Sequence, residues 1–391
     1  MKLNKKHIGL LGSCLMNNIL YMFLNTFMVA YFITLTNYNY QLISIYYIIS
    51  FVFILLTFLL LGRIIKNKNQ IWIFRIGIIL HCIYVLTIAL LKENIINYYI
   101  FLGAFYGIVQ GFFWSAGHTL INEHVGKNSN KFVSINTVLD KIFEILFPII
   151  FGVSIELTSF SYVAKIVIII SLTQLIFSFL VSDNRAISKH KYNLKEYRSK
   201  FKDNEKLNNY YKMICCDGIV NYLLETLIVI IIVMTFKKTI SLGFITTIFA
   251  ICSIISIYLF QNKIKNKKRM LSISSISMII SVIFLLLNIN KFTVIIYNLC
   301  VSIFLVILSN RAQAKRYTII SNIKEIQKDY LVEHQVFSEV CLNITRIIAY
   351  SVLFIASLFN NMILFKVLLI LVTIIILLYS KLIIKLEEGE K

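Results

Sequence analysis

The segment FVSINTVLDKIFEILFPIIFG, residues 132–152, has the length of a membrane-spanning helix but carries ionisable residues at its centre. A helix needs about 20 apolar residues to cross a hydrocarbon core about 30 Å thick. Asp140, Lys141 and Glu144 lie in the middle of this one, followed by Pro148, the single proline of the chain. A charge at that depth costs about 3 kcal/mol or more unless it is paired or hydrated. We therefore expect these groups to face the interior of a helix bundle.

Apolar runs of similar length recur along the whole chain of 391 residues. Hydrophobic residues make up 59% and charged residues only 15%, which is far more apolar than a soluble domain. The runs are too long and continuous for the strands of a membrane β-barrel, and helices satisfy the backbone within lipid. The sequence therefore predicts an all-α polytopic membrane protein with about twelve transmembrane helices. The expected spans are 8–33, 42–62, 71–91, 97–122, 132–156, 162–182, 213–236, 241–261, 270–289, 292–312, 331–359 and 362–380.

The longest polar stretch, residues 183–212, is basic and divides the spans into two six-helix halves, 1–182 and 213–391. The N-terminus, the even-numbered loops and the C-terminal tail hold 29 of the 39 lysines and arginines. Short loops rich in these residues stay cytoplasmic, so we expect both termini and the linker in the cytoplasm.

The net charge of +21 is spread over all of these loops. Membrane topology and contact with the anionic lipid bilayer explain it, and no nucleic-acid partner is expected. Heavy use of Ile, Asn, Lys, Phe and Tyr is typical of AT-rich bacterial genomes, so the bacterial cytoplasmic (inner) membrane is the expected location. The seven cysteines show no metal-ligand spacing, and we expect no metal, no cofactor and a functional monomer.

The fifth span places Asn136, Asp140 and Glu144 on one helix face at i, i+4 and i+8. Lys141 lies three residues before Glu144 and can neutralise one carboxylate. The other carboxylate could bind a cation or a proton, or it could pair with Arg346 across the bundle. An ion-pair network that only ties the two halves together is the alternative.

The eleventh span repeats this pattern at the corresponding place in the second half. Its polar stripe consists of Glu339, Asn343, Arg346 and Tyr350. At about 1.5 Å per residue, Asp140 and Glu339 each lie about 12 Å into their spans, close to the membrane midplane. The match between NTVLDKIFEI and EVCLNITRII indicates a weak internal repeat, as in duplicated transporters.

The seventh span carries Asp217, Asn221 and Glu225, again at i, i+4 and i+8. Asp217 is near the cytoplasmic end, where we expect it to be solvated. Glu225 is deeper and has no basic residue nearby in its own helix, so it must find a partner, water or a proton. It is the strongest candidate for proton coupling, with a structural role as the alternative.

The first and fourth spans of each half carry further polar or aromatic stripes that could line a cavity. Histidine in such a stripe is a hydrogen-bonded group or a proton relay, and the aromatic residues are packing groups or ligand stackers. The acidic residues nearby favour a cationic or neutral solute. The candidates are Asn18, Tyr21 and Asn25 in the first span, Gln110, Trp114 and His118 in the fourth, and Asn298 in the tenth, with Asn221 and Asn343 from the stripes above.

With these features the chain resembles the major facilitator superfamily over its whole length. The loop LLLGRIIKNKN keeps the glycine of the family motif, Gly62, but has Lys66 where the family has an acid. GIVQGFF keeps the Gln-Gly pair but has Gly107 at the arginine position, and FPIIFG keeps only Pro148 and Gly152 of the exporter motif. The resemblance implies a central cavity lined by the first and fourth spans of each half.

The leading interpretation is a secondary active transporter that moves a small-molecule substrate by alternating access, possibly with proton coupling. A lipid-linked saccharide flippase of another twelve-helix fold is the alternative. An intramembrane enzyme that uses Asp140 and Glu144 as acid and base is less favoured, because the chain contains no HExxH or GxSxG motif. A channel would need a pore signature, which is missing.

Overall fold

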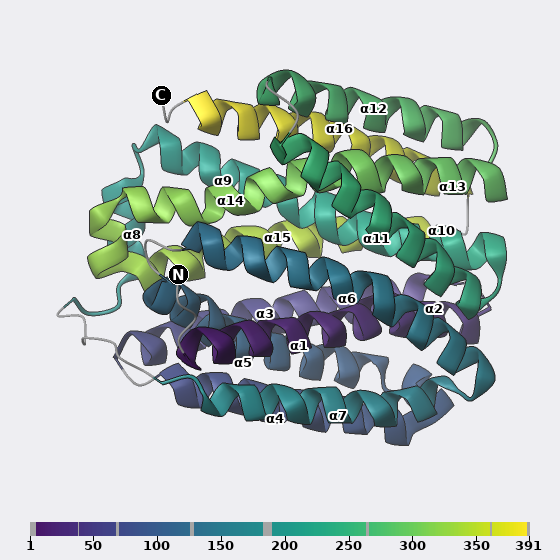
Figure 1. Ribbon diagram of the computed structural model, residues 1–391, viewed down its shortest axis with the longest axis horizontal. Coiled ribbons are helices and arrows are strands. Elements are labelled where there is room, and N and C mark those ends of the chain that lie inside the picture. Colours follow the sequence, from purple (N-terminus) through teal and green to yellow (C-terminus); the bar gives the residue numbers. More distant parts are fainter. Residues whose placement is uncertain are drawn as a thin grey trace.

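The computed structural model is a bundle of long helices that run roughly parallel to its long axis (Figure 1). It describes residues 5–37, 39–67, 70–125, 129–182, 190–262, 266–359 and 362–388. All regular structure in these ranges is helical, which confirms the all-α prediction. Eleven helical segments within them are long and apolar enough to cross a membrane. α6 (Ser129–Leu157) is also of spanning length but carries the three central charges.

The first half contains six long helical segments. They are α1 (Lys5–Met22) continued by η1 (Phe23–Phe27) and α2 (Met28–Leu35); α3 (Gln41–Asn67); α4 (Gln70–Leu91) with η2 (Lys92–Ile96); α5 (Tyr99–Val125); α6; and α7 (Phe160–Phe179).

The second half repeats this number. Its segments are α9 (Glu205–Asp217), η4 (Gly218–Leu223) and α10 (Leu224–Phe236); α11 (Thr239–Asn262); α12 (Lys267–Leu287); α13 (Lys291–Cys300), η5 (Val301–Leu305) and α14 (Val306–Asn322); η6 (Ile326–Tyr330) and α15 (Leu331–Leu358); and α16 (Met362–Glu388). A short helix, α8 (Leu194–Phe201), lies between the halves in the sequence.

Several helices are longer than their predicted spans. The seventh begins at Glu205 instead of residue 213, and the tenth continues to Asn322 instead of ending at residue 312. Hydropathy marks only the part of a helix that matches the thickness of the hydrocarbon core, whereas the backbone hydrogen bonds continue into polar sequence. Part of the predicted linker, residues 183–212, is therefore helical, because α8 and the start of α9 fall within it.

The two chain ends lie at the same end of the bundle as α8 (Figure 1). We call this the linker end. Across the two halves, α3 packs along α15, and α6 packs along α11. At the second contact, Gly152 and Gly243 let the backbones approach closely, since a Cβ built on Gly152 would lie 3.2 Å from the Cα of Gly243. Pro148 is adjacent, and its carbonyl oxygen occupies the space that a side chain on Gly243 would need.

Three of the long helices contain π-helical turns in their middle, namely η1, η4 and η5. They lie in the first, seventh and tenth spans, which correspond to the first helix of each half and the fourth helix of the second. π-helical turns occur frequently at functional sites, because the widened turn re-aims side chains. These three spans are also ones in which the sequence predicted polar stripes.

Candidate functional site

Glu225 connects the two halves in the middle of the bundle. It lies in the first turn of α10, directly after the π-helical turn η4, and accepts a hydrogen bond from the hydroxyl of Tyr21 on α1 at 2.9 Å. In the described part of the chain no lysine or arginine forms an ion pair with it. Both side chains are only partly buried although they contact each other inside the bundle. Part of the surface of each side chain therefore remains accessible.

Asp140 of α6 is bound by amide groups. Its two oxygens accept hydrogen bonds from Asn18 of α1 and from Asn136 one turn earlier in its own helix, both at 2.6 Å. Lys141 pairs instead with Glu144, as their i, i+3 spacing allows. The opposite face of α6 exposes apolar side chains, so the polar groups face inward. The exposed residues are Val138, Ile142, Leu146 and Ile150.

Arg346 of α15 is the buried cation of this region, with 4% of its surface exposed. Among the described residues it forms no ion pair with a carboxylate of α6, and its hydrogen bond goes to the side-chain oxygen of Asn343, at 3.1 Å. The guanidinium carbon lies 3.4 Å from the ring centre of Tyr222 and 5.2 Å from that of Phe51. Tyr222 belongs to η4 and Phe51 to α3, so Arg346 lies where the two halves meet.

Glu339, two turns before Arg346, contacts the fourth span. Its carboxylate accepts a hydrogen bond from Asn343 at 3.2 Å and lies 3.9 Å from the Nε2 atom of His118 on α5. The His118 ring is stacked on Trp114, with the ring centres 4.7 Å apart. The fourth and eleventh spans thus meet through the residues that the sequence singled out.

Asn25 lies in the π-helical turn η1 and is bound by two tyrosines. Its amide donates to the hydroxyl of Tyr106 on α5 and accepts from Tyr47 on α3, both at 2.9 Å. Gln110 is also buried on α5, and its Nε2 atom has no partner among the described residues. Asn298 does not join these contacts. Its amide donates to the carbonyl oxygen of Val294 in its own helix.

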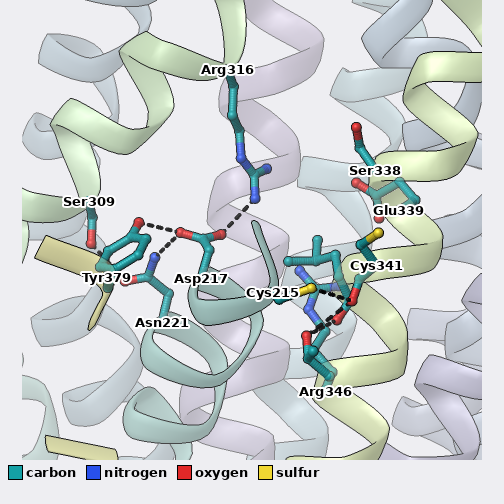
Figure 2. A network of polar contacts seen from close by, with 12 residues as sticks. Cys215, Asp217, Asn221, Ser309, Arg316, Ser338, Glu339, Cys341, Arg346 and Tyr379 are labelled. Atoms are coloured by element: carbon teal, nitrogen blue, oxygen red, sulfur yellow. Dashed lines mark hydrogen bonds and ion pairs between the residues drawn. The ribbon is translucent and has the colours of Figure 1, made fainter. Parts of the chain in front are cut away.

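Asp217 is not solvated, contrary to the prediction, and has only 6% of its surface exposed. Figure 2 shows its carboxylate between Arg316, Tyr379 and Asn221, each at 2.6 Å. Asn221 also accepts from Ser309 at 2.7 Å. The helix starts two turns earlier than hydropathy indicated, so Asp217 lies inside the bundle. This network joins α9, α14 and α16 within the second half.

A buried ion pair at the linker end was missed by the sequence reasoning. Lys66 at the end of α3 and Glu333 in the first turn of α15 are almost completely buried, with Nζ and Oε2 2.8 Å apart. Lys66 also donates to the backbone carbonyl of Asp329, and Glu333 accepts from the backbone N–H of Asn193 at 3.3 Å. The lysine in the place of the acid of the family motif was the available signal, but its partner lies 267 residues away.

Solved structures of known transporters have a similar fold over almost the whole chain. The structure of a bacterial homologue of the iron transporter ferroportin in an inward-facing state has a TM-score of 0.68 at 14% identity, covering 99% of each chain. A variant of the nucleoside transporter NupG has a TM-score of 0.64 at 13% identity, covering 98% of this chain and 99% of the other. The human organic anion transporter MFSD10 (TETRAN) has a TM-score of 0.59 at 11% identity, covering 97% and 98%.

No curated protein matches the sequence. The sequence model of the Major Facilitator Superfamily, in contrast, matches residues 7–315, which is most of the chain. Together with the all-helical fold, this match establishes a multi-pass membrane protein of a transporter family. The chain belongs to the Major Facilitator Superfamily.

Proposed function

We propose that this protein is a secondary active transporter that moves a small solute by alternating access, with proton coupling through Glu225. The observation that carries the proposal is the hydrogen bond between Tyr21 and Glu225, which joins the first helix of each half. A carboxylate in the membrane interior that has a neutral partner and no cation can take and release a proton as its surroundings change. Rocking of the two halves would change those surroundings.

Contacts between the halves occur at both ends of the bundle, as alternating access requires. At the linker end, Lys66 pairs with Glu333, and Thr119 donates to Gln335 at 2.7 Å. At the opposite end, the ring of Tyr40 lies against that of Phe365, with the ring centres 5.9 Å apart. Opening either end breaks one set of contacts while the other set can stay formed.

The direction of insertion follows from the charges. We propose that the linker end faces the cytoplasm of a bacterium, that the protein lies in its inner membrane, and that it works as a monomer. The alternative of a flippase with another twelve-helix fold no longer applies, because the family is now established. Asp140 is hydrogen-bonded to two amides and Glu144 is paired with Lys141, which gives no support to an acid/base pair for catalysis.

The experiment that tests the coupling role uses Glu225→Gln in reconstituted vesicles. The solute is first identified by uptake and efflux screening of a deletion strain. Glutamine mimics the protonated carboxyl group and keeps its shape, so flux driven by a pH gradient should be lost while equilibrium exchange of solute continues. Glu156→Gln, the same change at the exposed end of α6, is the matched control and should leave both activities intact.

Two results would count against the proposal. Normal gradient-driven flux in Glu225→Gln would exclude the coupling role. Loss of expression or of solute binding together with flux would instead show that Glu225 is structural.

A further inference from the structure

The guanidinium of Arg346 has no anionic partner in the part of the chain that the structure describes. Its only hydrogen bond goes from Nη1 to the neutral amide of Asn343, and its buried Nε has no partner among the described residues. An arginine side chain stays protonated in proteins, so it cannot avoid the cost of burial by losing its charge. In the low dielectric of a membrane protein interior, such a cation normally lies near an anion.

Two other cations inside the bundle, the buried Lys66 and the partly buried Arg316, have carboxylate partners. Lys66 is paired with Glu333 at 2.8 Å and Arg316 with Asp217 at 2.6 Å. Figure 2 shows the contrast, with Arg316 directed at the Asp217 carboxylate and Arg346 lying apart from it on α15. Neighbouring carboxylates could have served, but Glu339 is bonded to Asn343 and Glu225 to Tyr21.

The unpartnered edge of the guanidinium is the one that suits an anion. Tyr222 covers one face of the group at 3.4 Å, and Asn343 occupies Nη1. The Nε and Nη2 atoms that remain form the fork that binds a carboxylate or a phosphate with two parallel hydrogen bonds. Tyr222 is itself only partly buried and lies one turn before Glu225, so the guanidinium lies close to the proposed coupling residue in the sequence of contacts between the halves.

We infer that Arg346 binds an anionic group, a carboxylate or a phosphate, of the transported solute. This inference rests on the proposed function and names the substrate class of the same site. It replaces the expectation of a cationic or neutral solute, which counted the acidic residues without their partners. A proton bound by Glu225 would then balance the charge of the solute, because one proton and one negative charge on the solute have a net charge of zero.

The contact with both halves explains how binding could be tied to movement. Phe51 belongs to the first half and Tyr222 to the second, and both lie against the same guanidinium. An anion that binds this guanidinium therefore occupies the surface along which the halves meet. Its arrival changes the interactions of a group that both halves contact.

Binding can be tested on the purified full-length protein in detergent, without any flux measurement. The midpoint of thermal unfolding is measured with acetate, benzoate and inorganic phosphate at constant ionic strength. Benzylammonium and benzyl alcohol serve as the cationic and neutral counterparts of benzoate. At least one anion should raise the midpoint of the wild type by about 3 °C or more at saturating concentration, and the other two probes should not.

Three variants assign the effect to a residue. Arg346→Gln should lose the anion-dependent shift, and Arg346→Lys, which keeps the charge without the fork, should need at least about tenfold more anion. Arg311→Gln, at an ion pair with Glu387 between α14 and α16, is the control and should respond like the wild type. Without ligand, Arg346→Gln should unfold within a few degrees of the wild type, since no internal ion pair is lost.

An equal anion response in Arg346→Gln, or the absence of any anion response in the wild type, would overturn the inference. A marked loss of stability in ligand-free Arg346→Gln would also overturn it, by revealing a structural role. These outcomes are separate from the proposed function. If the protein carries a neutral or cationic solute but binds no anion, the inference fails and the proposed transport function stands. If it binds an anion but carries no solute, the transport function fails and the inference stands.

Discussion

Removal of Lys66 should destabilise the linker end of the protein strongly. Its partner Glu333 is 0% exposed, so Lys66→Met would leave a buried carboxylate with only the Asn193 N–H as a partner. Stranding one member of a buried pair costs about 3–5 kcal/mol. At about 1.4 kcal/mol per factor of ten, the closed linker end would lose stability by about 100-fold to 4,000-fold. Lys66→Asp, which restores the acid of the family motif, should be worse, because two carboxylates would then meet.

A double-mutant cycle checks this reasoning. Lys66→Met, Glu333→Gln and the double variant are compared by the midpoint of thermal unfolding in detergent. If the two side chains are coupled as the 2.8 Å contact indicates, the double variant should be more stable than the sum of the single losses predicts, by about 1.5 kcal/mol or more. Additive losses would refute the argument, since they would mean that each group is stabilised independently of the other.

Three further predictions concern other contacts and the topology. Lys141→Ala should reduce stability or transport, and Glu144→Gln added to it should restore part of the loss, because the second change removes the stranded partner; no recovery would contradict the pairing. Gly243→Ala should lower the unfolding midpoint more than Gly117→Ala, since the new Cβ would meet backbone at Gly243 but ordinary van der Waals neighbours at Gly117; equal midpoints would count against the close helix contact. A cysteine at Lys202 should stay unlabelled by an impermeant maleimide in intact cells, and labelling from outside would reverse the topology.

The fold was predictable because lipid leaves few choices. Long apolar runs, a basic midpoint and the lysine distribution indicate two six-helix halves without any knowledge of contacts. The pairing of Lys141 with Glu144 was also predictable, because both lie on one helix and their spacing decides it. Helix ends such as Glu205 were not, because polar turns that extend a helix into water have no hydropathy signal.

Partners in other helices could not be derived from the sequence. The spacing placed Asn136 on the same helix face as Asp140, but the second partner, Asn18, was not predicted, because the rotation of α1 against α6 decides which residue faces Asp140. The burial of Asp217 and its pairing with Arg316 depend on the angle between two helices 99 residues apart. Weak internal symmetry located the polar spans but gave no information on which side chains of those spans meet.

The charged groups inside the bundle divide in the way that the proposed alternating-access function would require. Lys66 and Glu333 form an ion pair at the linker end. Breaking a buried ion pair is costly, so this pair would stabilise the state in which the linker end is closed. Glu225 and Arg346 in the middle have neutral hydrogen-bond partners, one each, in Tyr21 and an amide. An ion pair between these two would have to be broken in every cycle before a proton or a solute could bind. Keeping them apart leaves each free to exchange a weak neutral contact for its ligand, which is why the absence of that pair is the feature expected of a working centre.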